Sequence, residues 1–342
     1  MIRVTQLSSL RWIWLAFIGL AFFVSCSHAP QQIAVSGETM GTTYHIRYVS
    51  ANPRHDADKV KERVNGLLAQ INSQMSTYDP DSELSKFNRR ETTQPVVISR
   101  SLEQVVRRAL EIAEETDGLL DVTIGPLVNL WSFGPEQRPE QVPTEAELAA
   151  AYERTGYQHL TVENHQLQKH IPQLSVDLST IAKGYAVDRV AILLEQMEIQ
   201  NYLVEIGGEM SMKGSKPGNQ PWRIAIERPD NSQRAAQRII EPGTNAVATS
   251  GDYRNYFQED GVRYSHIIDP RTGAPIQHNL VSVTVVTESC MDADAYATAM
   301  TVMGPEAALQ FAEQKQLAVM LIARENGDYK EYTSTAFKPF LQ

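Results

Sequence analysis

Apolar and polar residues follow two different periods along this chain. Between Thr43 and Val49 the apolar residues alternate with polar ones, which predicts a strand with Tyr44, Ile46 and Tyr48 on one face. A helical stripe follows, because apolar residues recur three and four positions apart at Val60, Val64, Leu67, Leu68 and Ile71. Both patterns return further along the chain, so helices and strands are interspersed.

Capping residues indicate where further helices begin and end. Ser101 with Gln104 fits a capping box that opens a helix ending at Gly118. Thr144 with Glu147 opens another, which ends before Gly156. Apolar spacing predicts three more helices, over Leu178–Glu195, from about Asp292 to Met303, and over Pro305–Lys315.

The second half of the chain contains most of the expected strands, namely Tyr202–Ile206, Arg223–Ile226, Val247–Ser250, Tyr264–Ile268, Val281–Val286 and Leu317–Ile322. Helices and strands mix without a regular βαβ rhythm, which favours an α+β fold class over a doubly wound sheet. No internal repeat and no clean linker divides the chain. We therefore expect one compact domain over residues 33–342, either undivided or built of two closely packed halves.

The first residues of the chain have the pattern of a secretory signal. Arg3 and Arg11 precede an apolar run, Trp12–Val24, which is shorter than the roughly 20 residues that a membrane span needs. The run ends in Phe-Val-Ser-Cys, which resembles a bacterial lipobox and makes Cys26 the expected lipidation site. We interpret residues 1–25 as a lipoprotein signal peptide and 26–32 as a tether. Residue 27 is Ser, which by the bacterial sorting pattern favours the outer membrane. An Asp at this position would favour retention in the inner membrane. A plain signal peptide with an incidental cysteine is the alternative.

Composition narrows the function classes. Among 342 residues the net charge is -10, which argues against a nucleic-acid-binding protein with a basic face. Two cysteines cannot build a disulfide framework or a cysteine-ligated zinc site. If Cys26 is lipidated, Cys290 has no partner in the chain and is most simply a buried free thiol.

The segment from Asp177 to Tyr185 is a candidate anion site. Asp177 follows a strand-like stretch and precedes the expected helix, where free N–H groups and the helix dipole favour an anion. Lys183 lies six residues on, within reach of a phosphate chain. The alternative is that Asp177 only caps the helix and Lys183 is a surface lysine. The Gly-rich spacing of a Walker A loop is absent.

A second candidate lies on the expected helix after residue 290. Asp294 and Thr298 are four residues apart, so both oxygens point the same way. A carboxylate and a hydroxyl suit Mg²⁺, which takes few protein ligands together with substrate phosphates. Asp292 faces about 120° away from Thr298 and is not expected to be a ligand. An acidic first turn that stabilises the helix dipole is the alternative interpretation.

Other residues are weaker candidates. His266 stands before a tight turn at a strand end, where it is either a general base or a satisfied polar residue. Two glycines in Glu205–Glu209 indicate either a close approach to a ligand or a bulge. Side chains that could contact a flat ligand are Met40, Tyr78, Trp131 and Phe133. No Gly-x-Ser-x-Gly elbow, protease signature or kinase signature is present.

Taken together, these motifs resemble the ApbE family, the FAD:protein FMN transferases. The segments that carry the resemblance occur in family order between about residues 36 and 322 and cover nearly the whole mature chain. They are 38–44, 75–78, 117–128, 131–134, 177–188, 205–209, 266–273 and 293–298. The chain departs from the family at Ser132, where Gly is frequent, and at Thr180, where a smaller residue is frequent.

The resemblance implies a T-fold-like α+β architecture and Mg²⁺-dependent transfer of FMN from FAD to a Thr or Ser hydroxyl, with release of AMP. It implies that FAD contacts Met40, Tyr78, Leu119, Leu120, Asp121, Asp177, Lys183 and Ile268. It implies that Mg²⁺ is held by Asp294, Thr298 and the backbone carbonyl of Thr180. The expected catalytic residues are His266, as base or phosphate neighbour, Asp294 and Lys183.

Two other functions remain open from the sequence. An FAD pyrophosphatase would use the same site, with water in place of the acceptor hydroxyl, and would give FMN and AMP. A lipoprotein that stores FAD without chemistry would not need Asp294, Thr298 and Lys183 at the phosphates. For the transferase, the expected partner is an acceptor protein facing the periplasm, such as a flavin-bearing subunit of a membrane redox complex. The expected location is the bacterial cell envelope, with the chain anchored through Cys26.

Overall fold

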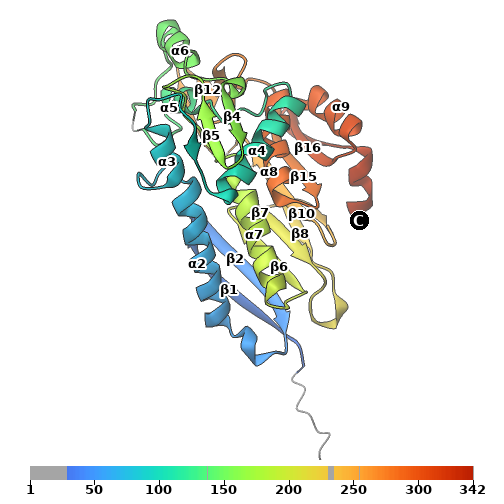
Figure 1. Cartoon of the computed structure of the whole chain (residues 1–342). Coiled ribbons are helices and arrows are strands. Elements are labelled where there is room, and N and C mark those ends of the chain that lie inside the picture. The colour runs from blue at the N-terminus through green and yellow to red at the C-terminus, as the bar shows by residue number, and fades with distance from the viewer. Residues whose placement is uncertain (1–28, 137, 230–234, 254, 342) are drawn as a thin grey trace, which may run out of the picture.

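The computed structural model describes residues 29–136, 138–229, 235–253 and 255–341 (Figure 1). Its centre is an eight-stranded antiparallel sheet in the order β1-β2-β6-β7-β10-β15-β16-β17. The strands are β1 (Gln31–Thr39), β2 (Thr42–Ser50), β6 (Tyr202–Ile206), β7 (Glu209–Lys213), β10 (Ala246–Gly251), β15 (Leu280–Thr287), β16 (Ala318–Glu325) and β17 (Asp328–Thr333).

Helices cover one face of this sheet. In Figure 1, α2 and α7 lie over β1, β2 and β6, and α8 lies over β10 and β15. The largest apolar cluster fills the space between, with fully buried Tyr44 and Tyr48 from the sheet and Val60 and Val64 from α2. The helices are α2 (Ala57–Met75), α4 (Arg100–Glu115), α7 (Ala182–Gln196), α8 (Cys290–Met303) and α9 (Pro305–Lys315).

The opposite face of the sheet carries a thinner layer. It consists of the hairpin β8 (Ile224–Glu227) and β9 (Ala236–Ile240) and the C-terminal 3-10 helix η5 (Thr335–Phe340). Ile224 and Ile226 pack there against Val247 of β10 in a second apolar cluster. The sheet is therefore covered on both sides, which explains why β15 and β16 are buried along most of their length.

Short elements cap one end of the sheet and frame the site described below (Figure 1). The aromatic cluster of Trp131, Phe257 and Tyr264 holds the helices at residues 125–152 against the two hairpins at residues 256–275. The short helices are α3 (Glu83–Asn88), α5 (Gly125–Leu130) and α6 (Glu145–Tyr152). A small sheet consists of β3 (Val96–Val97), β5 (Gln166–Lys169) and β4 (Leu160–Glu163). The two hairpins are β11 (Tyr256–Glu259) with β12 (Val262–Ser265), and β13 (Ile268–Asp269) with β14 (Ala274–Pro275).

Several expected boundaries are confirmed and three are corrected. Helix α9 has the predicted bounds, and Thr144 with Glu147 forms the predicted capping box of α6. The helix expected to open at Ser101 is capped by Ser99, whose side chain accepts from Leu102 N. The helix expected from Leu178 begins at Ala182. The strand expected over Tyr264–Ile268 is broken between β12 and β13.

The expected signal peptide and the lipidation site at Cys26 lie outside the described residues. Strand β1 begins at Gln31, so the last two residues of the expected tether already belong to the sheet. No helix among the described residues is long and apolar enough to span a bilayer. Cys290 is a buried free thiol, as predicted.

Candidate active site

A cavity of about 540 Å³ opens at the end of the sheet where the short elements gather. Its lining residues fall into two groups, here called arms, which come from different elements. One arm consists of Tyr78, the 119–124 loop, Phe133 and the 266–268 segment, and the other consists of β8 and the end of β10. Residues 177–183, the turn between β6 and β7, and α8 also line the cavity.

A buried ion cluster forms the polar centre of the cavity. Lys183, in the first turn of α7, places its Nζ 2.6 Å from Oε1 of Glu209 and 3.6 Å from Oδ1 of Asp294. The side chains of Glu209 and Asp294 are only 5% and 7% exposed. Burial alone would lower the pKa of Lys183, but these two carboxylates raise it. The lysine is therefore a fixed positive charge rather than a surface lysine.

The same surroundings favour the neutral form of Glu209, whereas they favour the charged form of Lys183. Burial raises its pKa above the ordinary value, and the Asp294 charge raises it further, while Lys183 opposes both effects. With all three groups ionised, the cluster carries one net negative charge. Such a cluster repels a pyrophosphate unless a further cation is present.

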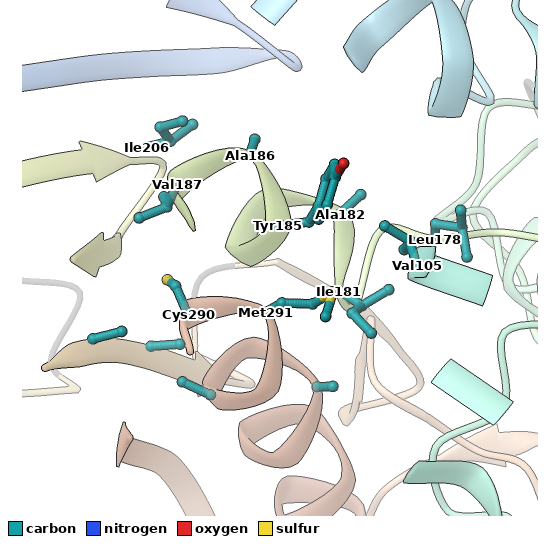
Figure 2. Close-up of a cluster of buried hydrophobic side chains, with 14 of the residues drawn as sticks. Val105, Leu178, Ile181, Ala182, Tyr185, Ala186, Val187, Ile206, Cys290 and Met291 are labelled. Atoms are coloured by element: carbon teal, nitrogen blue, oxygen red, sulfur yellow. The ribbon is translucent and has the colours of Figure 1, made fainter. Parts of the chain in front are cut away.

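The cluster depends on an unusually close approach of α7 to α8. A Cβ built on Gly184 would lie 2.3 Å from the carbonyl oxygen of Cys290, so only glycine fits there. In Figure 2, Cys290 and Met291, at the start of α8, lie beside the first turns of α7, which carry Ala182 and Tyr185. The close approach lets Oδ2 of Asp294 accept a hydrogen bond from Gly184 N at 3.0 Å.

Asp188 completes the link between the two helices. Its Oδ1 accepts from Cys290 N at 2.8 Å, and its Oδ2 accepts from Met291 N at 3.0 Å and from the Ser289 hydroxyl at 2.9 Å. These N–H groups have no partner within α8, so an α7 carboxylate caps α8. Each helix thus contributes a carboxylate that binds the first turn of the other.

Three oxygen donors expected to hold a metal line this cavity. Thr298 faces it from α8, with its hydroxyl donating to the carbonyl of Asp294 at 3.1 Å. The Thr180 hydroxyl is buried and has no hydrogen-bond partner. Gly184 N–H lies in the first turn of α7, where it has no partner within the helix, and it donates to Asp294. Hard oxygen atoms are thus available where Mg²⁺ would need them.

No group of three or more His, Cys, Asp or Glu residues that could hold a metal occurs in the described part of the chain. The candidate donor set is consistent with this, since it has one carboxylate, one hydroxyl and one carbonyl. Asp292, which the sequence excluded as a ligand, is paired with Arg108 through bonds of 2.9 and 3.1 Å.

His266 lies in the cavity lining with a defined orientation. Its Nδ1 is 3.1 Å from the backbone carbonyl of Asn255, so Nδ1 carries a proton and Nε2 keeps its lone pair. The ring meets Phe133 edge-on, with centroids 6.3 Å apart. Burial lowers the pKa of His266, which favours the neutral ring. A neutral imidazole with a free Nε2 is suited to accept a proton.

The arm that contains Tyr78 has the features of a site for a flat ligand. Tyr78 stands at its rim with 73% of its surface exposed, and Leu119, Leu120 and Ile268 line it. An exposed aromatic ring beside an apolar slot can stack on a planar group.

Two carboxylates of the lining already bind their own loops. Oδ1 of Asp121 accepts from the backbone N and the hydroxyl of Thr123, and Oδ1 of Asp177 accepts from Ser179 N. Burial raises the pKa of both carboxylates. Asp177 is five residues before the start of α7, so it shapes the loop and does not cap the helix.

The cavity brings together every residue expected to contact FAD, to hold Mg²⁺ or to act in catalysis, except Met40. Met40 lies in the turn between β1 and β2 with a φ of 50° and packs partly buried against the main core. Trp131 is also a core residue, and its indole N–H donates to the Gly273 carbonyl at 2.7 Å. Ser132, where the family frequently has Gly, adopts a φ of 67°, a conformation that glycine enters without strain.

Sequence reasoning did not identify Glu209 or the strand residues of the second arm. The only signal for Glu209 was its place directly after Gly207 and Gly208, both of which have positive φ in the turn. The pairing of Glu209 with Lys183 joins β7 to α7 and has no local pattern. Strand β8 was expected as a strand but not as part of a site.

Comparison with known proteins agrees with this geometry. The model of the ApbE family matches residues 40–321. The chain belongs to the ApbE family. A Vibrio cholerae relative named FAD:protein FMN transferase is 52% identical over 329 residues, covering 96% of this chain and 98% of the relative. An Escherichia coli relative of the same name is 42% identical, covering 94% of each chain.

Solved ApbE structures have the same fold. The flavin transferase ApbE from Vibrio cholerae superimposes with a TM-score of 0.86 at 51% identity, covering 91% of this chain and 100% of the other. The apo flavinyl transferase ApbE from Pseudomonas stutzeri superimposes with a TM-score of 0.85 at 38% identity, covering 92% and 98%. The predicted α+β class and ApbE architecture are therefore confirmed.

Proposed function

We propose that this ApbE-family chain is a Mg²⁺-dependent FAD:protein FMN transferase that moves FMN from FAD to a Thr or Ser hydroxyl of an acceptor protein. The observation that carries the proposal is the buried cluster of Lys183, Glu209 and Asp294 beside an arm suited to a flat ligand. The names of its relatives support flavin transfer. The metal, the released AMP and the acceptor hydroxyl are inferred from the chemistry of the site.

The charge balance supports a metal. A cluster with one net negative charge is a poor site for the pyrophosphate of FAD, whereas an added divalent cation makes it positive. Asp294, Thr298 and the carbonyl of Thr180 would hold Mg²⁺, which would neutralise charge developing on the transferring and leaving oxygens. The side-chain hydroxyl of Thr180 is a further oxygen at this position, buried and without a partner.

The reaction divides into defined tasks for the protein. The acceptor hydroxyl oxygen forms a bond to the phosphorus that carries riboflavin, and the bond from that phosphorus to the bridging oxygen breaks, so that AMP leaves. Nε2 of His266 takes the hydroxyl proton. Lys183 binds the pyrophosphate oxygens, and Glu209 fixes the direction of the ammonium group. Tyr78 and the apolar arm hold the flat part of FAD.

The pyrophosphatase and the storage protein remain the competing functions. The pyrophosphatase needs the same groups and differs only in admitting water as the nucleophile. A storage protein gains nothing from two carboxylates buried beside the phosphates, because burying charge is costly. The cluster therefore favours catalysis over storage.

We also propose that the chain is lipid-anchored through Cys26 and works facing the periplasm, at the outer membrane if Ser27 follows the bacterial sorting pattern. The lipobox-like sequence supports this, and the acceptor would then be a periplasm-facing protein. Labelling with a fatty-acid analogue tests the anchor, which should be lost on Cys26→Ala substitution. Retained label on that variant would contradict the assignment.

The activity is tested with the purified chain starting at Ser27, FAD and Mg²⁺, with and without an acceptor domain carrying a candidate Thr. AMP together with an acceptor heavier by one FMN residue supports the transferase. AMP with free FMN, regardless of which acceptor domain is offered, supports the pyrophosphatase. Tight FAD binding without release of AMP would support only the function of a protein that stores FAD.

A further inference from the structure

Strand β10 has an open edge inside the eight-stranded sheet. It pairs with β15 along its full length of six residues, but with β7 only at Ala246 and Val247. Beyond Val247 no described strand pairs with the β7 side of β10. Thr249, Ser250 and Gly251, at this open edge, line the cavity. A sheet edge that ends in a cavity is a template for another strand.

The direction of the backbone groups can be assigned from neighbouring hydrogen bonds. Asp252 N donates to the Val281 carbonyl of β15, and the Asn245 carbonyl accepts from Met212 N of β7. Backbone groups of successive residues point to opposite sides of a strand, and the β10–β15 register is continuous. Thr249 and Gly251, which share the direction of Asn245, therefore point their N–H and C=O groups at the open edge.

The two faces of this edge have different surroundings. Ala248 belongs to the apolar cluster on the helix side, where α8 carries Asp294 and Thr298. Val247 belongs to the cluster on the opposite side, together with Ile224 and Ile226 of β8. A strand added here would therefore have one set of side chains facing the metal-binding and phosphate-binding groups and the other set facing an apolar wall.

The expected FAD contacts leave this arm free. Tyr78, Leu119, Leu120 and Ile268 belong to the other arm, and none of the residues expected to bind FAD comes from β8 or β10. The ion cluster lies beside the open edge, because Glu209, the partner of Lys183, directly precedes Met210, which pairs with Val247 of β10. The nucleophile must reach this cluster while FAD is bound, and the β10 edge runs next to it.

We propose that the open edge of β10 binds an extended segment of the acceptor protein by strand addition. The hydroxyl residue of that segment faces α8, and its two immediate neighbours are apolar and face β8. This inference rests on the proposed transferase function. Pairing with Thr249 and Gly251 gives affinity that does not depend on sequence, and the apolar wall gives selectivity.

The first test uses a peptide library, because any acceptor sequence can then be represented. Peptides of seven residues with a central Thr and random flanks are incubated with the protein, FAD and Mg²⁺, and peptides carrying FMN are sequenced. We expect apolar residues to be enriched on both sides of the Thr. AMP release with no labelled peptide, or labelling without this enrichment, would overturn the proposal. No AMP at all would instead contradict the proposed function.

The second test measures backbone pairing in one labelled peptide. Each peptide nitrogen is methylated in turn, and kcat/KM for FMN transfer is measured. Strand addition predicts a loss of about tenfold or more at every second position and little change between them, because only alternate N–H groups point at β10. Equal sensitivity at all positions, or at none, would contradict strand addition.

A matched pair of variants tests the apolar wall. Ile226 of β8 belongs to the wall and lines the cavity, whereas Ile240 of β9 is buried in the same apolar cluster but does not line the cavity. Ile226→Thr should raise the KM for the peptide by about tenfold and leave acceptor-free FAD cleavage unchanged, while Ile240→Thr, which loses a similar apolar contact, should change neither. Equal KM values for the two variants would overturn the placement of the segment beside β8.

Discussion

The carboxylate of Asp294 accepts a hydrogen bond from the backbone N–H of Gly184, on the neighbouring helix, at 3.0 Å. The bond supplies an acceptor for an N–H group that the first turn of α7 leaves unpaired, and it fixes Asp294 beside Lys183. Asp188 makes the reciprocal bonds from α7 to the start of α8. The geometry of the ion cluster therefore depends on how closely two helices approach each other.

Gly184→Ala tests that dependence. The added methyl group would collide with the backbone of Cys290. We therefore expect the free energy of unfolding to fall by about 1–3 kcal/mol and the rate of FAD cleavage to fall sharply. Thermal melting and AMP release measure the two effects. Gly66→Ala is the control, since a Cβ there meets nothing within 4 Å, and it should be neutral or stabilising. Similar behaviour of both variants would contradict the close-approach argument.

Asp294→Ala should abolish Mg²⁺-dependent turnover while leaving measurable FAD binding. We expect turnover to fall by about a hundredfold or more, because a metal ligand and a partner of Lys183 are both lost. Flavin fluorescence reports binding and AMP release reports turnover. Asp292→Asn, two residues away and paired with Arg108, should retain most of the activity. Normal turnover in Asp294→Ala would remove the metal assignment.

Tyr78→Ala should weaken FAD binding. Losing the exposed ring at the rim removes a stacking surface, which corresponds to about a tenfold rise in Kd. Tyr78→Phe keeps the ring and should bind FAD normally, which separates stacking from any role of the hydroxyl. Unchanged affinity in the Ala variant would exclude Tyr78 from the FAD site.

Glu209→Gln should separate the binding of FAD from its cleavage. Without that carboxylate the cluster loses its net negative charge, so FAD should bind more tightly than wild type in the absence of metal. Turnover with Mg²⁺ should fall by about tenfold or more, because Lys183 loses the partner that orients it. Glu205→Gln, on the same turn but outside the cluster, is the control. Weaker metal-free binding in Glu209→Gln would contradict this charge balance.

The pH dependence of transfer should reflect His266. Its lowered pKa means that the neutral base persists below the ordinary value of about 6.5, so kcat/KM should fall only in more acidic solution. His266→Asn should lower the rate and remove this acid limb. An unchanged acid limb in that variant would assign the base to another group.

Local sequence patterns predicted which helices and strands form better than they predicted the residue at which each one begins. The Thr144–Glu147 box and the bounds of α9 depend on residues a few positions apart, and both are confirmed. From sequence, Ser101 is the better cap, because Gln104 three residues later completes a capping box, whereas Leu102 stands three residues after Ser99. The structure has Ser99 as the cap, and its N–H is also held by the distant Glu83. Contacts of this kind cannot be predicted from a local window.

The same distinction between local patterns and distant contacts applies to the site. Lys183, Asp294 and Thr298 carry local or family patterns and lie together in the cavity. The start of α7 was misplaced because Asp177 binds Ser179 N in its own loop and Ile181 is not helical, with a φ of -149°. Glu209 was missed because its partner is on another element and its burial depends on the whole fold.

The most direct test of the account is the intact mass of an acceptor after incubation with FAD and Mg²⁺. The acceptor is a Thr-bearing domain or a labelled library peptide, and the wild-type chain is compared with Asp294→Ala. We predict one added FMN residue and one AMP released per acceptor with wild type, and neither with the variant. AMP release with the acceptor mass unchanged, or equal labelling by the variant, would contradict it.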